Sequence, residues 1–443
     1  MSPGLTRIEV QEGRRLTPQQ IFAATAARET SLSRLLMTYI TTGLIFMLLP
    51  GTFLGVWNLF AISSRRAPDS ISAAWVQAHG HAQIFGWIGT FILGIGFYSI
   101  PKLRRLNGFA LPAAWTSWVL WTSGVTLRWL AGVYQWHWRV LLPLSAALEL
   151  TAFLIFFRSV SGHRIEGAGK KKLDAWVLVV IAGALGLMLA LLANLGAALF
   201  LALRGAAPEL SAEIDQRILA LQTWGFLAPF VWGFSARWLP VFLGLRPVRA
   251  RALLAAVAVN SAGVLASLAG RTAASAILLA AGILTAVCAL RLLEAPERPA
   301  KAEGVHASYP IFVRMAYVWA AIAAGLGIWS AFAANSHGIS GASRHALTVG
   351  FLATMVFAVG QRVLPAFSGM RLLFSRGLMF AGLLLLAGGC LLRVASEILA
   401  YQGVVAAAWS WLPVSAICEM AAVTAFAVNL LVTFARPRRT SGA

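Results

Sequence analysis

Long apolar runs follow one another along nearly the whole of this 443-residue chain. A helix that crosses the hydrocarbon core of a bilayer needs about 20 apolar residues, whereas a strand of a membrane barrel needs about 10 of alternating polarity. Only 12% of the residues are charged, against roughly 25% in a soluble protein. The chain is therefore predicted to be an all-α polytopic membrane protein that sits in a lipid bilayer.

Proline, glycine and charge punctuation divide the apolar sequence into twelve predicted transmembrane helices, called spans 1 to 12 below. They cover residues 35–62, 75–101, 112–131, 138–158, 174–203, 217–240, 252–270, 272–292, 311–334, 344–366, 377–396 and 409–434. An even number of spans puts both termini on one side of the membrane. Lys and Arg concentrate in the connectors on that side, including Arg104, Arg164 and Lys170 to Lys172, which predicts cytoplasmic termini in a bacterial inner membrane.

Residues 1–33 form a basic segment that is predicted to be cytoplasmic. Thr17 and Pro18 resemble an N-cap followed by proline at the first helical position, which favours a short surface helix over 18–28; a disordered tail is the alternative. The net charge of +21 reflects orientation in the membrane, so it does not indicate nucleic-acid binding. The three cysteines lie in apolar runs without a CxxC pair, which favours packing over zinc binding or disulfides.

An internal repeat relates spans 2, 6 and 10. Without a gap, the segment from Ala220 aligns with the segment from His345. The identical pairs include Thr223/Thr348, Gly225/Gly350, Phe226/Phe351, Leu227/Leu352, Ala228/Ala353, Arg237/Arg362 and Pro240/Pro365. Span 2 fits the same frame, with His81, Gly86 and Pro101 in register. These glycine-rich helices are predicted to lie innermost, around one axis, because small residues permit close helix packing.

Four-helix units follow from this repeat. They are residues 34–165, 173–300 and 310–436, within one membrane domain of pseudo-threefold symmetry. The first and third units also share LPLSAALE, which ends at Glu149, with LPVSAICE, which ends at Glu419. They share an arginine as well, Arg128 and Arg393, where the second unit has Ser267. This asymmetry favours a site between units one and three; neutral drift of the second unit is the alternative.

Histidines are the strongest functional signal, because a titratable side chain inside a membrane span is costly. His81 and His345 occupy the same repeat position on spans 2 and 10, near the outer membrane face. Two imidazoles that face each other can bind both sides of a haem iron, so a bis-histidine haem of type b is predicted between them. His79 lies about 200° around the helix from His81, so the two imidazoles point in different directions. One of them is predicted to hold the haem, and the other a metal such as copper, a second haem or a hydrogen-bond partner; which of the two is the haem ligand stays open.

Two repeat-related arginines and two glutamates accompany the histidines. Arg128 and Arg393 are predicted to bind the anionic haem propionates, since guanidinium groups match carboxylates well; snorkelling to the interface is the alternative. Glu149 and Glu419 are candidates for a proton path, a metal ligand or a partner of the arginines. The sequence leaves these three roles for the glutamates open.

The string HGHAQIFGW in span 2 resembles haem-ligand helices of the large subunit of haem–copper oxidases and nitric-oxide reductases. HALTVGFLATM in span 10 resembles a motif of the NnrS family, membrane proteins of nitric-oxide metabolism that contain haem and copper. The resemblance implies a subunit I-like fold, His81 and His345 at the family histidines, and His79 as the first member of an HxH pair. Ala82 replaces the glutamate that follows the second histidine in the NnrS family.

Three functions remain open. The leading hypothesis is an NnrS-like haem protein of nitric-oxide tolerance or membrane electron transfer, with nitric oxide as gas ligand and an unidentified redox partner. The second is a haem–copper oxidase or nitric-oxide reductase subunit. Spans 6 and 7 contain no histidine, so the oxidase copper ligands are missing and an enzymatic activity is undecided. The third is a transporter without a cofactor, which the three parallel units fit poorly.

Overall fold

The computed structural model describes residues 17–106, 108–162, 173–301, 303–333, 337–369 and 371–436, and within these ranges the chain is helical throughout its regular structure. The elements are α1 (Pro18–Phe46), η1 (Met47–Phe53), α2 (Leu54–Arg65), η2 (Pro68–Ser70), α3 (Ala73–His81), η3 (Ala82–Gly89), α4 (Thr90–Arg104), α5 (Leu111–Val133), α6 (Trp138–Val160), α7 (Ala175–Arg204), α8 (Ala212–Ala220), η4 (Leu221–Leu227), α9 (Ala228–Phe242), α10 (Ala250–Leu268), α11 (Thr272–Leu290), α12 (Tyr309–Phe332), α13 (His337–His345), η5 (Ala346–Ala353), α14 (Thr354–Phe367), α15 (Arg376–Tyr401) and α16 (Ala408–Ala435). Residues 1–16 of the predicted N-terminal segment, and Arg164 and Lys170 to Lys172, lie outside the described residues.

Eleven helical segments of the described chain are long and apolar enough to cross a membrane. The twelfth predicted span is α5, a helix of 23 residues that carries Trp115, Trp118, Trp121, Trp129 and Arg128. Tryptophan and arginine lower the hydropathy of a span, yet both residue types are common near membrane interfaces. The twelve predicted spans therefore correspond to twelve helical segments, and the all-α membrane fold is confirmed.

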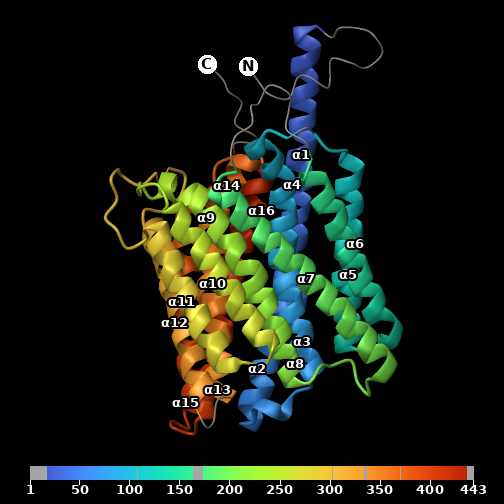
Figure 1. Ribbon diagram of the computed structural model, residues 1–443, viewed down its shortest axis with the longest axis vertical. Coiled ribbons are helices and arrows are strands. Elements are labelled where there is room, and N and C mark those ends of the chain that lie inside the picture. The colour runs from blue at the N-terminus through green and yellow to red at the C-terminus, as the bar shows by residue number, and fades with distance from the viewer. Residues whose placement is uncertain are drawn as a thin grey trace.

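Helix α1 begins where the sequence predicts a cap but continues further than predicted. The Thr17 side chain accepts a hydrogen bond from the Gln20 backbone, the Gln20 side chain accepts one from the Thr17 backbone, and Pro18 occupies the first turn. No proline or glycine follows before Gly43, so nothing ends the helix at residue 28. The predicted surface helix is thus the first part of span 1, which projects beyond the bundle (Figure 1).

Spans 2, 6 and 10 are the innermost helices, as the sequence predicts. The most apolar window is 78% buried in Ala73–Arg104, 72% in Ala212–Phe242 and 72% in Gly338–Phe367, against 33% to 56% in the other eight segments. Residues of α4, α9 and α14 also line one shared cavity. The three repeat-related helices therefore surround a common axis, while the flanking helices face lipid.

The same local distortion recurs in these three helices. A π-helical segment starts directly after His81, Ala220 and His345, the three residues that the repeat places in register. A π-helical turn widens the helix and shifts the hydrogen-bonding pattern of the backbone, and such turns are frequent at functional sites. The position of the π segments agrees with the sequence alignment of spans 2, 6 and 10. The boundaries of the three four-helix units stay a prediction.

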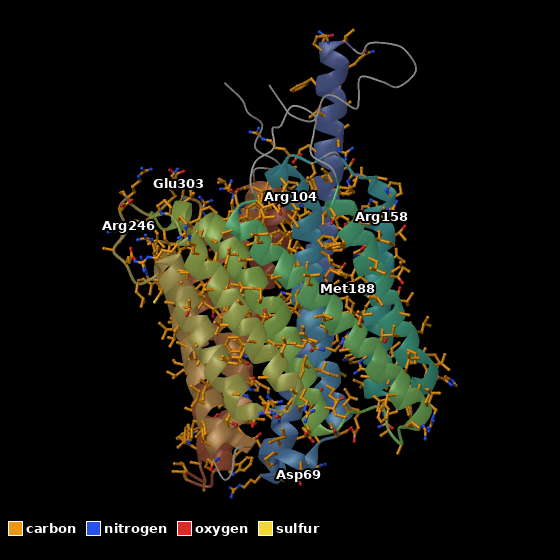
Figure 2. The ribbon with its side chains drawn as sticks, viewed as in Figure 1. Asp69, Arg104, Arg158, Met188, Arg246 and Glu303 are labelled. Carbon is orange, nitrogen blue, oxygen red and sulfur yellow. The ribbon has the colours of Figure 1, made fainter. Side chains whose placement is uncertain are left out.

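Helix α1 begins and helix α16 ends at the same end of the bundle, called the terminus-bearing end below (Figure 1). Arg104, Arg158, Arg246 and Glu303 lie at this end, and Asp69 lies at the opposite end with α2, α3, α8 and α13 (Figure 2). In a connector at the terminus-bearing end, Glu294 accepts hydrogen bonds from Arg291 (2.9 Å) and Arg249 (3.0 Å). The hydrogen bond from Arg291 and the nearby cations hold the pKa of the Glu294 carboxyl below its usual range.

Candidate functional site

His79 and His345 each use one ring nitrogen to bind a backbone carbonyl. His79 Nδ1 lies 2.8 Å from the Gly51 oxygen in η1, and His345 Nδ1 lies 3.0 Å from the Gly341 oxygen one turn earlier in α13. A carbonyl oxygen only accepts hydrogen bonds, so Nδ1 carries the proton in both rings. The neutral imidazole then presents its lone pair on Nε2. Metal-binding histidines typically show this arrangement, because the second hydrogen bond fixes the ring.

A carboxylate that the sequence analysis missed also contacts His345. Glu397 of α15 lies 3.1 Å from His345 Nδ1 and is 4% exposed. Its carboxylate fills the space that a side chain at Gly341 would need. Arg393, one turn earlier on α15, places Nη2 3.4 Å from the same carboxylate. The i,i+4 spacing of an arginine and a glutamate inside an apolar helix is the signal that could have revealed this pair.

Arg393 retains unused hydrogen-bonding capacity. It is 5% exposed, and among the described residues its Nε and Nη1 atoms have no hydrogen-bond partner. A buried guanidinium with free donors is expensive unless an anion accepts them. Glu419 of α16, which lies within electrostatic range of Arg393 and His345, makes no ion pair with Arg393 within 4.0 Å. The free donors of Arg393 fit an anionic group such as a haem propionate.

His79 lies near this cluster. It interacts electrostatically with His345 and Arg393, and its ring packs against Gly55, where an added Cβ would lie 2.6 Å from His79 Cε1. We call His79, His345, Arg393, Glu397 and Glu419 the His345 cluster. It joins spans 2, 10, 11 and 12 at the end of the bundle that is remote from the termini.

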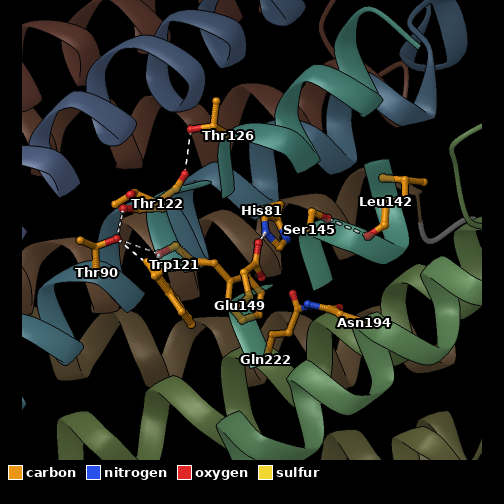
Figure 3. Close-up of polar contacts among 12 residues, drawn as sticks. His81, Thr90, Trp121, Thr122, Thr126, Leu142, Ser145, Glu149, Asn194 and Gln222 are labelled. Atoms are coloured by element: carbon orange, nitrogen blue, oxygen red, sulfur yellow. Dashed lines mark hydrogen bonds and ion pairs between the residues drawn. The ribbon is translucent and has the colours of Figure 1, made fainter. Parts of the chain in front are cut away.

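His81 belongs to a different contact. Its Nε2 atom lies 2.8 Å from Glu149 Oε1 of α6, and the two side chains are 9% and 1% exposed. Phe85 stacks on the His81 ring with 4.6 Å between the ring centroids. Since a carboxylate accepts, Nε2 carries the proton and His81 presents Nδ1 instead. Figure 3 shows this pair.

Other polar side chains surround the pair of His81 and Glu149. Gln222 of η4 donates to Asn194 of α7 over 3.0 Å, and both amides lie near Glu149 in Figure 3. Arg128 interacts electrostatically with Glu149 and with Asp215 of α8. Arg128 and Arg393 therefore lie beside different histidines. The sequence prediction that both arginines reach one haem site stays a prediction, and the contacts favour Arg393.

The helix contacts show how the second unit differs. A Cβ at Gly124 would lie 2.7 Å from Glu149 Cγ, and one at Gly389 would lie 2.9 Å from Glu419 Cγ. In the second unit, a Cβ at Gly263 would lie 2.9 Å from Leu279 Cδ2. The same glycine contact thus faces a glutamate in the first and third units and a leucine in the second. Leu279 fills the position of the carboxylate there, which agrees with the sequence asymmetry.

Two cavities of the described structure lie away from His81 and His345, and the predicted cavity between these histidines stays a prediction. One lies on the axis between α4, α9 and α14, and the other lies among residues of η1, α2, α3 and α5. Within the described ranges, no three His, Cys, Asp or Glu side chains gather to hold a metal ion. The bis-histidine pairing of His81 with His345 stays a prediction; the observed contacts give each of the two its own carboxylate.

Comparison with known proteins identifies the family. A family model described as "NnrS protein" matches residues 37–438. No curated protein sequence matches the chain. A solved structure, described as a cryo-EM structure of a heme-copper terminal oxidase dimer, superposes with a TM-score of 0.67 at 13% identity. The match covers 93% of this chain and 85% of the other, which shows a shared fold of the oxidase subunit I type. The chain belongs to the NnrS family.

Proposed function

We propose that the chain binds a b-type haem between spans 2 and 10, with His345 and His79 as axial ligands, and serves nitric-oxide tolerance or membrane electron transfer. The observation that carries this proposal is that the His345 and His79 rings make the same kind of hydrogen bond. Both anchor Nδ1 on a backbone carbonyl, at 3.0 Å and 2.8 Å, and leave Nε2 available. His81 instead engages Nε2 with Glu149, so its use as a ligand would require displacement of that carboxylate.

Neighbouring residues supply the remaining requirements of such a site. Arg393 offers two buried donors without a partner among the described residues, which suits a propionate. The Glu397 carboxylate lies 3.1 Å from His345 Nδ1, and its negative charge would make that imidazole a stronger electron donor to iron. A bound haem would supply one-electron chemistry, and a diatomic gas would bind its iron only where one of the two histidines is displaced. The chain's own residues would hold the group, orient His345 and keep water away through the apolar π-helical walls.

The family membership supports a role in nitric-oxide metabolism. An oxygen-reducing oxidase is less well supported, because spans 6 and 7 contain no histidine and the copper ligands of that class are absent from the sequence. Among the described residues, no three His, Cys, Asp or Glu side chains gather at one place, and copper binding stays a prediction from the sequence. A transporter without a cofactor leaves the unpaired donors of Arg393 unexplained.

Optical spectroscopy of the purified chain tests the proposal. We expect a low-spin haem spectrum in the wild type that is lost in His345→Ala and His79→Ala. His81→Ala should keep the spectrum, since its contact is with Glu149. Loss of the spectrum in His81→Ala and retention in His79→Ala would assign the axial role to His81. A wild type that binds no haem when expressed with sufficient haem would overturn the proposal.

A further inference from the structure

An apolar cavity lies on the axis of the bundle, away from the histidines. Its volume is about 110 Å³, and its walls come from α4 with η3, α9 with η4, and α14 with η5. Ile92, Val231 and Val356 line it, and each lies eleven residues after the aligned residues His81, Ala220 and His345. Because repeat-related residues of all three helices meet there, the cavity follows from the threefold arrangement itself.

A second ring of repeat-related residues continues the wall one turn further along the helices. Ile95, Phe234 and Val359 line the cavity, and each lies fourteen residues after the same three reference positions. These side chains differ in size between the three helices. The axis therefore cannot be filled symmetrically, and the space that remains is bounded by aliphatic and aromatic groups.

Water is a poor occupant of this cavity. Ser235 and Trp238 carry the only side-chain hydroxyl and N–H among the residues that line it, and the Ser235 hydroxyl already pairs with the Tyr317 hydroxyl at 2.7 Å. A buried water needs two to four polar partners, whereas apolar cavities stay dry; one of about 150 Å³ binds benzene or xenon. A small uncharged molecule that has no hydrogen bonds to lose meets the requirements of volume and polarity.

We propose that this axial cavity is a binding site for small apolar gas molecules, either a noble gas atom or a diatomic. The cavity is separate from the proposed haem: Ile92 lies thirteen residues beyond the proposed ligand His79, about 20 Å along the helix. A molecule there would contact no histidine. The site would hold gas that has dissolved in the membrane, at the centre of the three inner helices. This inference goes beyond the proposed function and does not depend on haem binding.

Xenon is the probe for this site, because its anomalous X-ray scattering locates it directly. Crystals of the purified full chain would be pressurised with xenon. We expect a peak between Ile92, Val231 and Val356 in the wild type. Val231→Phe should remove the peak, because the larger ring fills the cavity. The matched control is Val241→Phe on the same helix, where the side chain is 50% exposed and does not line the cavity; it should keep the peak.

A variant that enlarges the cavity tests the proposal from the other direction. Phe234→Ala removes a ring from the wall and should raise xenon occupancy at the same position, whether or not Val231→Phe folds. Absence of a wild-type peak on the axis, at pressures that fill sites elsewhere on the molecule, would overturn the proposal. So would an unchanged peak in a folded Val231→Phe, or an acyl chain found in the wild-type cavity. None of these outcomes depends on haem.

Discussion

At the residue scale, the Glu397 carboxylate is placed to influence how strongly His345 donates electrons to a bound iron. This carboxylate lies 3.1 Å from His345 Nδ1 and 3.4 Å from Arg393 Nη2. Glu397→Gln removes the negative charge that faces the Arg393 guanidinium. We therefore expect the free energy of unfolding to fall by up to about 3 kcal/mol, which thermal unfolding would show as a lower midpoint temperature. The substitution should also raise the reduction potential of bound haem, because His345 becomes a weaker donor. Glu419→Gln serves as the control and should change the potential less; equal effects would contradict the assignment.

Arg393 and Arg128 should contribute differently to haem retention. Arg393 has buried donors without a partner in the described structure, whereas Arg128 interacts with Glu149 and Asp215. Arg393→Ala should therefore weaken haem retention in a dialysis or transfer assay with apomyoglobin. Arg128→Ala should mainly lower stability. If both variants lose haem equally, the original symmetric prediction from the sequence holds.

The sequence alone predicts where the histidines and arginines lie along their helices, but not which side chains they contact. The repeat brings His81 and His345 into register, and it also pairs Arg128 with Arg393. The contacts of a histidine depend on the direction in which its ring points from the helix. The repeat alignment does not predict this direction, since Glu397, which contacts His345, aligns with Gly132 in the first unit. The third unit therefore holds a carboxylate where the first unit holds none. Only the packed structure shows that His81 turns to Glu149 instead.

At the scale of helices, glycine positions decide how closely the spans approach. A Cβ at Gly186 of α7 would overlap the Gly225 carbonyl oxygen in the π segment η4, whereas one at Gly196 of the same helix would meet nothing within 4 Å. Gly186→Ala should thus push α7 away from span 6 and destabilise the fold by about 1–3 kcal/mol. Gly196→Ala should leave the unfolding temperature nearly unchanged. Thermal unfolding in detergent measures both; similar effects would refute the close contact.

Helix limits were largely readable from the sequence, but the π segments were not. Hydrophobic runs, prolines and the Thr17 cap fix where spans begin and end, since each has a local physical cause. The π segments after His81, Ala220 and His345 lie in the three helices that surround the axis. No residue pattern within a single span distinguishes them from an ordinary helix. Their recurrence at aligned positions becomes visible only when the three inner helices are compared in space.

At the scale of the whole molecule, the structure places the basic connectors at the terminus-bearing end. Arg104, Arg158 and Arg246 lie there, opposite Asp69 (Figure 2). Lys and Arg in short connectors stay on the cytoplasmic side during insertion, so this end should face the cytoplasm. An even number of spans puts both ends of the bundle's chain on the same side of the membrane. If α5 did not cross the membrane, the number would be eleven and the two ends would lie on opposite sides.

Cysteine labelling of the intact cell membrane tests orientation and span number together. Asp69→Cys lies in the short η2 segment between spans 1 and 2, and a membrane-impermeant maleimide should label it from outside. Glu303→Cys lies in the connector between α11 and α12 and should react only after the membrane is opened. The three native cysteines, of which Cys288 is exposed on the helix surface, would be replaced by alanine first. Labelling of Glu303→Cys from outside, with Asp69→Cys protected, would show that the topology is inverted. Labelling of both sites from outside would show that the number of spans between them is wrong.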